Sequence, residues 1–450
     1  MATTSGDRGE WGSKLGFVFA AAGSAVGLGN IWKFPSEVAE NGGAAFLVIY
    51  LLCCFVVGFP VMVAELSIGR RTGKNPVGAF KALGGGPFVL VGYWGILCGV
   101  AILSFYLVIA GWTFSYAFSE LFHGLGQTAW SDAFAAQGSG PKNAIFTLLF
   151  ALATFLVVIG GVQSGIERVT KTLMPALLVI LVLMIGYVLF QPGSSEGLAV
   201  YLMPDFSKIS TGLIFQAMGQ AFFSLSLGMG ALITYGSYLN RRQNLPEAAA
   251  YVTLADVGIA FLAGLLIMPA MYAAQANGIA IFDAQGALIN STGLVFNVLP
   301  ALFHSMEGTI GLILGVTFFL LLSMAALTST ISLLEVPVAF LIDEHGMKRT
   351  QAAALITTIV GVIGAAVSFQ LSLIGSLDLV FNTIGLPLGG LMICLFLAYA
   401  WKTTNAMAEM EDGFPGVRDS AFGKIWPVAV GIVSPILIAI VLTTTLINLF

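Results

Sequence analysis

Five ionisable residues stand within or at the end of long apolar stretches of this sequence, where a charge is costly. They are Lys33, Glu65, Asp256, Glu335 and Asp378. Because removing such a group from water is unfavourable, an ionisable residue in an apolar segment points first to a binding or transport site. Lys33 and Asp378 lie near the ends of their stretches, where the side chains could instead reach water.

The other reactive side chains form no recognisable catalytic or metal-binding pattern. The three histidines, His123, His304 and His345, are far apart in the sequence, and the four cysteines all stand in apolar runs, as small buried hydrophobic residues do. The apolar stretches contain no Ser/His or Cys/His pairing, no HExxH and no GxSxG sequence. We therefore expect neither an enzyme nor a metal or haem centre.

The composition indicates an integral membrane protein. Of the 450 residues, 58% are hydrophobic and 9% are charged, whereas soluble domains carry roughly 25% charged residues. The net charge of −4, with no basic patch outside the short loops, argues against a nucleic-acid partner. The first residues are polar and no small-residue cleavage site follows the first apolar run, so we expect that run to be retained as a helix.

About eleven segments are apolar and long enough to cross a lipid bilayer, which takes about 20 helical residues. They are expected near residues 14–37, 44–70, 88–121, 142–161, 166–190, 211–239, 246–275, 307–342, 350–370, 374–401 and 424–449. The weakly polar connection 276–306 should be a structured extramembrane loop with short helices. The expected architecture is therefore all-α, with one transmembrane domain over residues 1–450.

The positive charges predict the orientation, because Lys and Arg accumulate on the cytoplasmic side. With the N-terminus inside, only Lys142 and Lys208 fall outside. The cytoplasmic set is then Arg8, Lys14, Arg70, Arg71, Lys74, Lys81, Arg168, Lys171, Arg241, Arg242, Lys348, Arg349, Lys402, Arg418 and Lys424. An odd number of spans places the C-terminus outside.

Two of the expected spans should be broken in the middle of the membrane. Residues 23–30 place three glycines in seven positions and end on Asn30, and residues 220–230 of the sixth span carry Ser224 and Ser226 beside two glycines. Breaks in spans one and six, which run in opposite directions, are typical of transporters built from inverted repeats, here about 14–190 and 211–401, with an additional helix about 424–449. Close helix packing is the alternative, but it explains only the glycines.

The stretch GSAVGLGNIWKFP at 23–35, with ENGG at 40–43 and GFP at 58–60, resembles the signature of the neurotransmitter:sodium symporter family, in particular its bacterial amino-acid branch. The resemblance extends over essentially the whole chain. It implies the leucine-transporter-like fold with helices 1 and 6 broken. It also implies sodium-coupled uptake of an amino acid by alternating access, in a cell membrane.

The resemblance implies two sites for Na⁺. The first would consist of the Ala25 carbonyl with Asn30, Ser224 and Asp256, completed by the substrate's carboxylate. The second would consist of the carbonyls of Gly23, Val26 and Ala325 and the hydroxyls of Thr328 and Ser329. A hard cation prefers such oxygens, and an unwound segment frees carbonyls that a helix would pair.

For the substrate, the resemblance places the carboxylate at the amides around Leu28 and Gly29 and at the Tyr106 hydroxyl. The ammonium group would meet carbonyls of Ala25, Phe223 and Ser226. The side-chain pocket would be Ile102, Phe223, Met229, Ser329 and Leu333. This pocket carries no fixed charge, so a charged side chain would be desolvated without a partner. Neutral hydrophobic and aromatic L-amino acids are therefore the expected substrates, and the adaptable Met229 favours broad specificity.

The gates follow the same resemblance. Lys33 and Asp378 match the outer ion pair, Arg8 and Asp343 match the inner pair with Trp11 and Tyr238 near it, and Phe223 matches the aromatic lid. Gly165 and Pro175 resemble the family's motif for local unwinding of the fifth span. A proline kink without motion is the alternative.

One departure from the animal members concerns chloride, which they bind near the positions of Tyr50, Gln220, Ser224 and Ala260. Ala260 offers no oxygen ligand, whereas Asp256 stands where many relatives have Asn. A fixed negative charge beside sodium can replace an anion, so chloride-independent transport is expected.

A channel would need a continuous polar pore, but the polar residues cluster at one depth. The sequence leaves the oligomeric state open.

Overall fold

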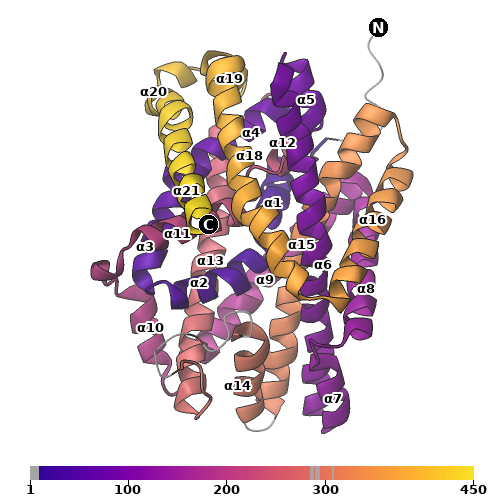
Figure 1. Ribbon diagram of the computed structural model, residues 1–450, viewed down its shortest axis with the longest axis vertical. Coiled ribbons are helices and arrows are strands. Elements are labelled where there is room, and N and C mark those ends of the chain that lie inside the picture. The colour runs from indigo at the N-terminus through magenta and orange to yellow at the C-terminus, as the bar shows by residue number, and fades with distance from the viewer. Residues whose placement is uncertain (1–9, 284–287, 289–293, 307–308, 450) are drawn as a thin grey trace.

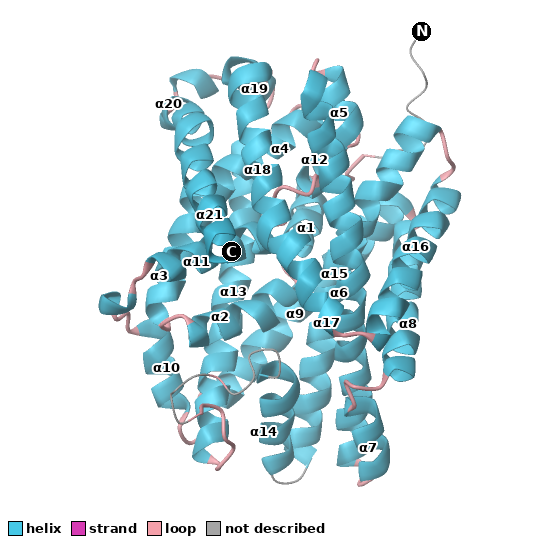
Figure 2. Cartoon of the chain, viewed as in Figure 1, coloured by secondary structure: helices cyan, strands magenta, loops and turns pink. Residues whose placement is uncertain are grey.

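The chain folds almost entirely into helices in the computed structural model (Figure 1, Figure 2). The structure describes residues 10–283, 288, 294–306 and 309–449. Within these residues the extended pairing is limited to an isolated antiparallel bridge between Phe282 and Leu288. The predicted all-α class is confirmed.

Most of the chain forms α-helices, interrupted by π-helical and 3-10 turns. The α-helices are α1 (Lys14–Ala25), α2 (Phe34–Glu40), α3 (Ala44–Cys53), α4 (Phe59–Thr72), α5 (Pro76–Ala82), α6 (Val89–Gly124), α7 (Thr128–Ala135), α8 (Gly140–Val158), α9 (Arg168–Val188), α10 (Ser194–Leu202), α11 (Thr211–Ser224), α12 (Ala231–Gly236), α13 (Leu245–Ala276), α14 (Leu299–Ser305), α15 (Thr309–His345), α16 (Arg349–Phe369), α17 (Ser372–Leu377), α18 (Gly385–Leu395), α19 (Thr403–Glu411), α20 (Ala421–Val428) and α21 (Ser434–Leu449). The π turns are η1 (Gly29–Lys33), η2 (Cys54–Gly58), η4 (Val162–Glu167), η6 (Leu294–Val298), η7 (Asp378–Ile384), η8 (Phe396–Ala400) and η10 (Ala429–Val433). The 3-10 turns are η3 (Gly86–Phe88), η5 (Phe206–Lys208) and η9 (Val417–Asp419).

Nine helices of the described residues are long and apolar enough to cross a membrane. The bent pair Lys14–Ala25 and Gly29–Glu40, with 51° between its halves, adds a tenth. Helices α11 and α12 are each too short to span alone, and residues 225–230 separate them. They are the two halves of the expected sixth span, so spans one and six are both broken, as predicted.

The first break has a visible cause in its backbone. Helix α1 ends at Ala25, Val26 is extended with φ −73° and ψ 106°, and η1 starts at Gly29. A Cβ atom on Gly27 would lie 2.2 Å from the Ser329 hydroxyl oxygen and 2.7 Å from the Tyr106 hydroxyl oxygen, so a larger residue would have to displace these side chains. The Asn30 side chain accepts a hydrogen bond from the Gly27 amide at 3.0 Å and replaces a lost helical partner.

The second break contains backbone in the left-handed region. Ser226 has φ 54°, and Gly228 and Gly230 have φ 83° and 77°. The Gly228 amide donates to a carboxylate oxygen of Glu65 on α4 at 2.7 Å. An ionisable residue singled out by the sequence therefore supports the unwound segment, because it satisfies an amide that no helix pairs.

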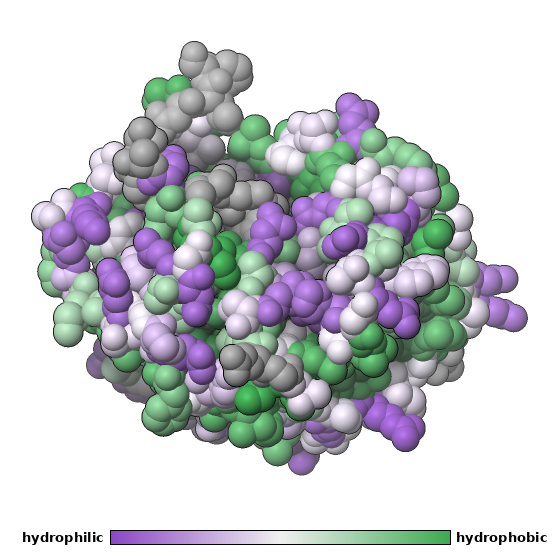
Figure 3. Space-filling view, turned by 90° about the horizontal axis from the view of Figure 1, so that it is seen from below, coloured by the Kyte–Doolittle hydropathy of each residue, from purple (hydrophilic) through white to green (hydrophobic). Residues whose placement is uncertain are grey.

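The broken helices lie in the interior of the bundle. Helix α1 packs against α9, α13 and α15, α12 packs against α4, and the long helices α6 and α15 lie side by side. Figure 1 shows α5, α19 and α20 at one end of the bundle, here called the α5 end, and α7 and α14 at the opposite end, here called the α14 end. Figure 3 looks onto the α14 end, where hydrophilic residues lie among apolar ones. The short helices η6 and α14 fall within the connection 276–306, as predicted.

Candidate functional site

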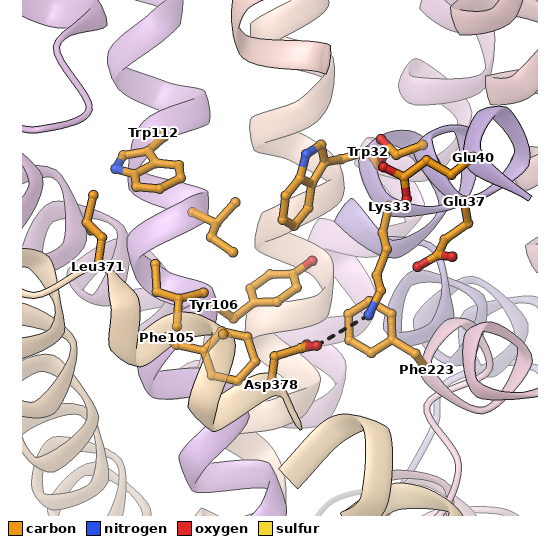
Figure 4. Close-up of a pocket in the computed structure, with 14 residues that line it drawn as sticks. Trp32, Lys33, Glu37, Glu40, Phe105, Tyr106, Trp112, Phe223, Leu371 and Asp378 are labelled. Carbon is orange, nitrogen blue, oxygen red and sulfur yellow. Dashed lines mark hydrogen bonds and ion pairs between the residues drawn. The ribbon is translucent and has the colours of Figure 1, made fainter. Parts of the chain in front are cut away.

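A cavity of about 380 Å³, here called the vestibule, opens beside η1, α6 and η7 (Figure 4). Its lining includes Trp32, Lys33, Tyr106, Phe223 and Asp378. The Lys33 ammonium lies 3.5 Å from the Asp378 carboxylate and 5.0 Å from the centre of the Phe223 ring. The structure therefore brings together the predicted outer ion pair and places it beside the predicted lid.

A second, much smaller cavity of about 20 Å³, here called the central cavity, lies between the two broken helices and α6 and α15. Tyr106 and Phe223 line both this cavity and the vestibule, so the two side chains form the partition between them. The central cavity is lined by Ser24, Ala25, Gly27, Gly29, Ile102, Tyr106, Phe223, Ser226, Met229, Ser329 and Leu333. Every predicted substrate residue except Leu28 is in this set.

Leu28 contributes its backbone beside the cavity. Its amide donates to the Tyr106 hydroxyl at 2.9 Å, which fixes this side chain of α6 against the first break. A Cβ atom on Gly29 would lie 2.9 Å from the Phe223 ring, so the ring lies directly against the backbone of η1. Free amides at the start of a half-helix favour a bound carboxylate.

Three residues predicted for the first sodium site, Asn30, Ser224 and Asp256, form one buried cluster. The Asn30 amide group donates to Asp256 Oδ1 at 2.7 Å and lies 3.1 Å from Ser224 Oγ. Ser224 donates to the Asp256 carboxylate at 2.9 Å, and Tyr50 lies within hydrogen-bond distance of both. Ala25 is buried and lines the adjoining central cavity. Asp256 is fully buried, and the described side chains that contact it, Asn30, Ser224 and Tyr50, carry no positive charge.

The residues predicted for the second sodium site also meet. The Thr328 hydroxyl donates to the carbonyls of Ala325 at 2.9 Å and Val26 at 3.3 Å, and the Ser329 hydroxyl lies 3.5 Å from the Val26 carbonyl. A Cβ atom on Gly23 would lie 3.2 Å from Thr328 Cβ, so α1 and α15 are in close contact here. The arrangement gathers carbonyl and hydroxyl oxygens, which suit a hard monovalent cation.

Comparison with known proteins identifies the family of the chain. Residues 8–137 and 129–450 match the sequence model of the Sodium:neurotransmitter symporter family. The chain belongs to this family. The symporter is similar to the sodium-dependent transporter YhdH of Bacillus subtilis, with 35% identity over 96% of each chain. It is also similar to the sodium-dependent serotonin transporter of Drosophila melanogaster, with 29% identity over 77% of this chain and 61% of the relative.

Among solved structures, the symporter is similar to the crystal structure of MhsT in complex with L-phenylalanine. The TM-score is 0.85, with 40% sequence identity over 97% of this chain and 100% of MhsT. The predicted leucine-transporter-like fold is therefore confirmed. The predicted membership of the chain in a family of sodium-dependent membrane transporters is confirmed as well.

The symporter is closely packed at its α5 end. Trp11 is 7% exposed, and its indole N–H donates to the Tyr235 carbonyl at 3.0 Å. Its backbone amide donates to the Tyr238 carbonyl at 3.2 Å. The Tyr238 hydroxyl donates to Glu335 at 2.7 Å, and Glu335 also pairs with Arg349. Glu335 therefore belongs to the contacts that pack this end of the bundle.

The predicted inner pair remains a prediction, because Arg8 lies outside the described residues. Its expected partner Asp343 accepts hydrogen bonds from the backbone and side-chain amides of Asn75, at 2.8 and 2.9 Å. Gly165 stands in the π turn η4, where a Cβ atom would lie 2.1 Å from the Val157 carbonyl, and Pro175 lies inside α9. Gly165 therefore lies in irregular backbone, whereas Pro175 lies within a continuous α-helix, and the hinge stays a prediction.

Ser24 lines the central cavity, although the sequence analysis does not predict it as a site residue. Its carbonyl accepts hydrogen bonds from Ser226 at 2.9 Å and from Ser329 at 3.4 Å, and it lines the central cavity. It thus joins both broken helices to α15. Every residue has a carbonyl, so no residue type could have signalled this role.

Proposed function

We propose that this symporter couples the inward movement of sodium to the uptake of neutral hydrophobic and aromatic L-amino acids. The observation that carries the substrate class is the central cavity, whose described lining has no carboxylate, ammonium or guanidinium side chain. Ile102, Met229 and Leu333 would receive the side chain. The amides of Leu28 and Gly29 with Tyr106 would bind the carboxylate, and carbonyls of Ala25, Phe223 and Ser226 the ammonium group. The phenylalanine bound to the similar MhsT supports the same class.

Two sodium sites are part of this proposal. Ala25, Asn30, Ser224 and Asp256 would hold the first ion, and the substrate carboxylate would complete its ligands. Gly23, Val26, Ala325, Thr328 and Ser329 would hold the second ion at the contact of α1 with α15. Because the first ion would touch the substrate, sodium and substrate should each raise the affinity of the other by the same factor.

Chloride should not be required. Asp256 supplies a negative charge within the cluster that contains Asn30, Ser224 and Tyr50. A fixed carboxylate can balance sodium there in place of a bound anion. At Ala260 the side chain offers no ligand atom.

The gating side chains support an alternating-access cycle. The vestibule opens at Lys33 and Asp378, whereas Trp11 and its partners close the α5 end. The basic residues Arg70, Arg71 and Lys81 lie at the α5 end, so that end would face the cytoplasm and the vestibule would face outside. The chain would work as a single transmembrane domain. Gly165 and Pro175 would allow local unwinding of α9 when the cytoplasmic side opens.

Uptake into proteoliposomes tests the proposal. Radiolabelled leucine, phenylalanine and tryptophan should accumulate with an inward sodium gradient and not with potassium, and replacing chloride by gluconate should leave uptake unchanged. Equal uptake in potassium would refute sodium coupling. Single-channel currents would instead favour a channel.

A further inference from the structure

Two histidines that take no part in the proposed transport site meet at the α14 end. The rings of His123, in the last turn of α6, and His304, on α14, stack face to face with centroids 3.4 Å apart and planes 5° apart. They stand 181 residues apart in the sequence, so the contact joins two separate elements. The pair is therefore a specific junction between α6 and α14.

A buried carboxylate completes this junction. Glu120, one turn before His123, is 1% exposed, and one of its oxygens lies 3.2 Å from His304 Nε2. Its other oxygen has no hydrogen-bond partner within the described part of the chain. Within the described residues, the titratable groups around His123 are His304, Glu120 and Asp132 of α7. On α15, the element on the other side of Glu120, the contact is with Gly315, which has no side chain.

The stack can hold one positive charge more easily than two. Histidine is the side chain whose charge ordinarily changes between about pH 5 and 8. The Glu120 carboxylate, 3.2 Å from His304 Nε2, gives the stack one anionic partner and therefore suits one positive charge there. A second proton on His123 would place two like charges face to face at 3.4 Å. That repulsion opposes the stack and pushes α14 away from α6.

The position of α14 is linked to the vestibule. The π turn η6 leads directly into α14. The ring of its Phe296 packs edge-on against the rings of Trp32 and Trp112, with ring centroids 6.4 and 5.8 Å apart. Both tryptophans line the vestibule. A displacement of α14 would therefore disturb Trp32 and Trp112, which line the vestibule that the substrate would cross.

We propose that His123 and His304 form a proton-responsive latch. The stack holds α14 on α6 while it carries at most one positive charge, and α14 is released when both rings are positively charged. Acid on the α14 side then slows transport. The effect on uptake rests on the proposed function, whereas the release of α14 does not.

Uptake is measured at saturating sodium, with the internal pH clamped and the external pH lowered from about 7.5 to about 5.5, which spans histidine titration. Wild-type uptake should fall by about threefold or more. His123→Phe retains a ring for stacking without a second charge and should abolish the response, as should the double variant His123→Asn/His304→Gln. His345→Asn, at the exposed third histidine, should respond like the wild type. A flat wild-type profile, or a wild-type response in His123→Phe, overturns the latch.

Hydrogen–deuterium exchange of α14 without substrate tests the release directly. After correction for the pH dependence of chemical exchange, residues 299–305 should exchange about threefold or more faster at acid pH in the wild type, as His protonation predicts, and equally at both values in His123→Phe. Unchanged exchange in the wild type overturns the proposal. If exchange responds as expected but no variant transports at any pH, the latch is supported and the proposed function fails.

Discussion

Replacing Asp256 by Asn should weaken sodium binding while preserving the fold. Asp256 is fully buried, and three polar side chains contact it at 2.7 to 3.4 Å. An amide has nearly the same size, and the hydroxyls of Ser224 and Tyr50 can rotate to accept from it. The substitution therefore removes a charge but leaves a polar group that can satisfy its neighbours.

The magnitude follows from the charge that sodium would meet. Two unit charges about 4 Å apart attract by about 4 kcal/mol at an effective dielectric constant of about 20. Burial of the carboxylate offsets part of this, and we expect about 2 kcal/mol to remain. That corresponds to an approximately 30-fold weaker apparent sodium affinity. By reciprocal coupling, substrate affinity at low sodium should fall by a similar factor.

The assay is equilibrium binding of radiolabelled phenylalanine over a sodium titration, with thermal unfolding in sodium and in potassium beside it. The variant should keep its unfolding temperature in potassium and lose most of the increase that sodium gives the wild type. Asp205→Asn, at an exposed aspartate bonded to Ser207, is the matched control and should change neither quantity. A sodium titration within about twofold of wild type, in a variant that is folded, would refute the assignment of Asp256.

Three further predictions concern the cavities. Gly27→Ala should abolish substrate binding in a folded protein, because its Cβ would lie 2.2 Å from the Ser329 hydroxyl oxygen; retained binding by scintillation proximity would contradict this close approach. Lys33→Met should change substrate affinity by less than about fivefold, because its 3.5 Å pair with Asp378 is partly exposed and worth about 1 kcal/mol or less; a larger loss in the same binding assay would assign Lys33 a direct role. Met229→Trp should reduce the uptake of tryptophan by about tenfold or more compared with its effect on the uptake of alanine, because the new indole side chain fills the cavity. Equal losses for both substrates in competition assays would place Met229 outside the specificity pocket.

The fold was largely predictable because its main signals are local. Long apolar runs marked the spans, and the glycines of residues 23–30 marked the break that the structure places after Ala25. Asn30 stood out because a polar side chain beside a break has few purely structural reasons to be there. These signals depend on neighbours in the sequence, which can be read without a structure.

The contacts that could not be predicted join distant residues or use the backbone. The sequence placed Glu335 in the membrane, but its pairing with Tyr238, 97 residues away, depends on how α12 meets α15. The stacking of His123 on His304 depends likewise on the packing of α14, because the sequence shows only that the two histidines lie far apart along the chain. The role of Ser24 lies in its carbonyl, a group without any sequence signature.

The π turn η1 has a geometric consequence for how the symporter could move. It starts one residue before Asn30 and ends at Lys33, so it joins the buried cluster of Asn30 and Asp256 to the ion pair of Lys33 with Asp378. A π turn holds one residue more than the α-helical pattern requires, and each helical residue turns the chain by about 100°. If the extra residue migrates along the helix, the side chains it passes rotate while both flanking segments stay in place. In that case the segment between the proposed sodium site and the Lys33–Asp378 pair would turn about its own axis, and the two ends of the first span would not have to move apart.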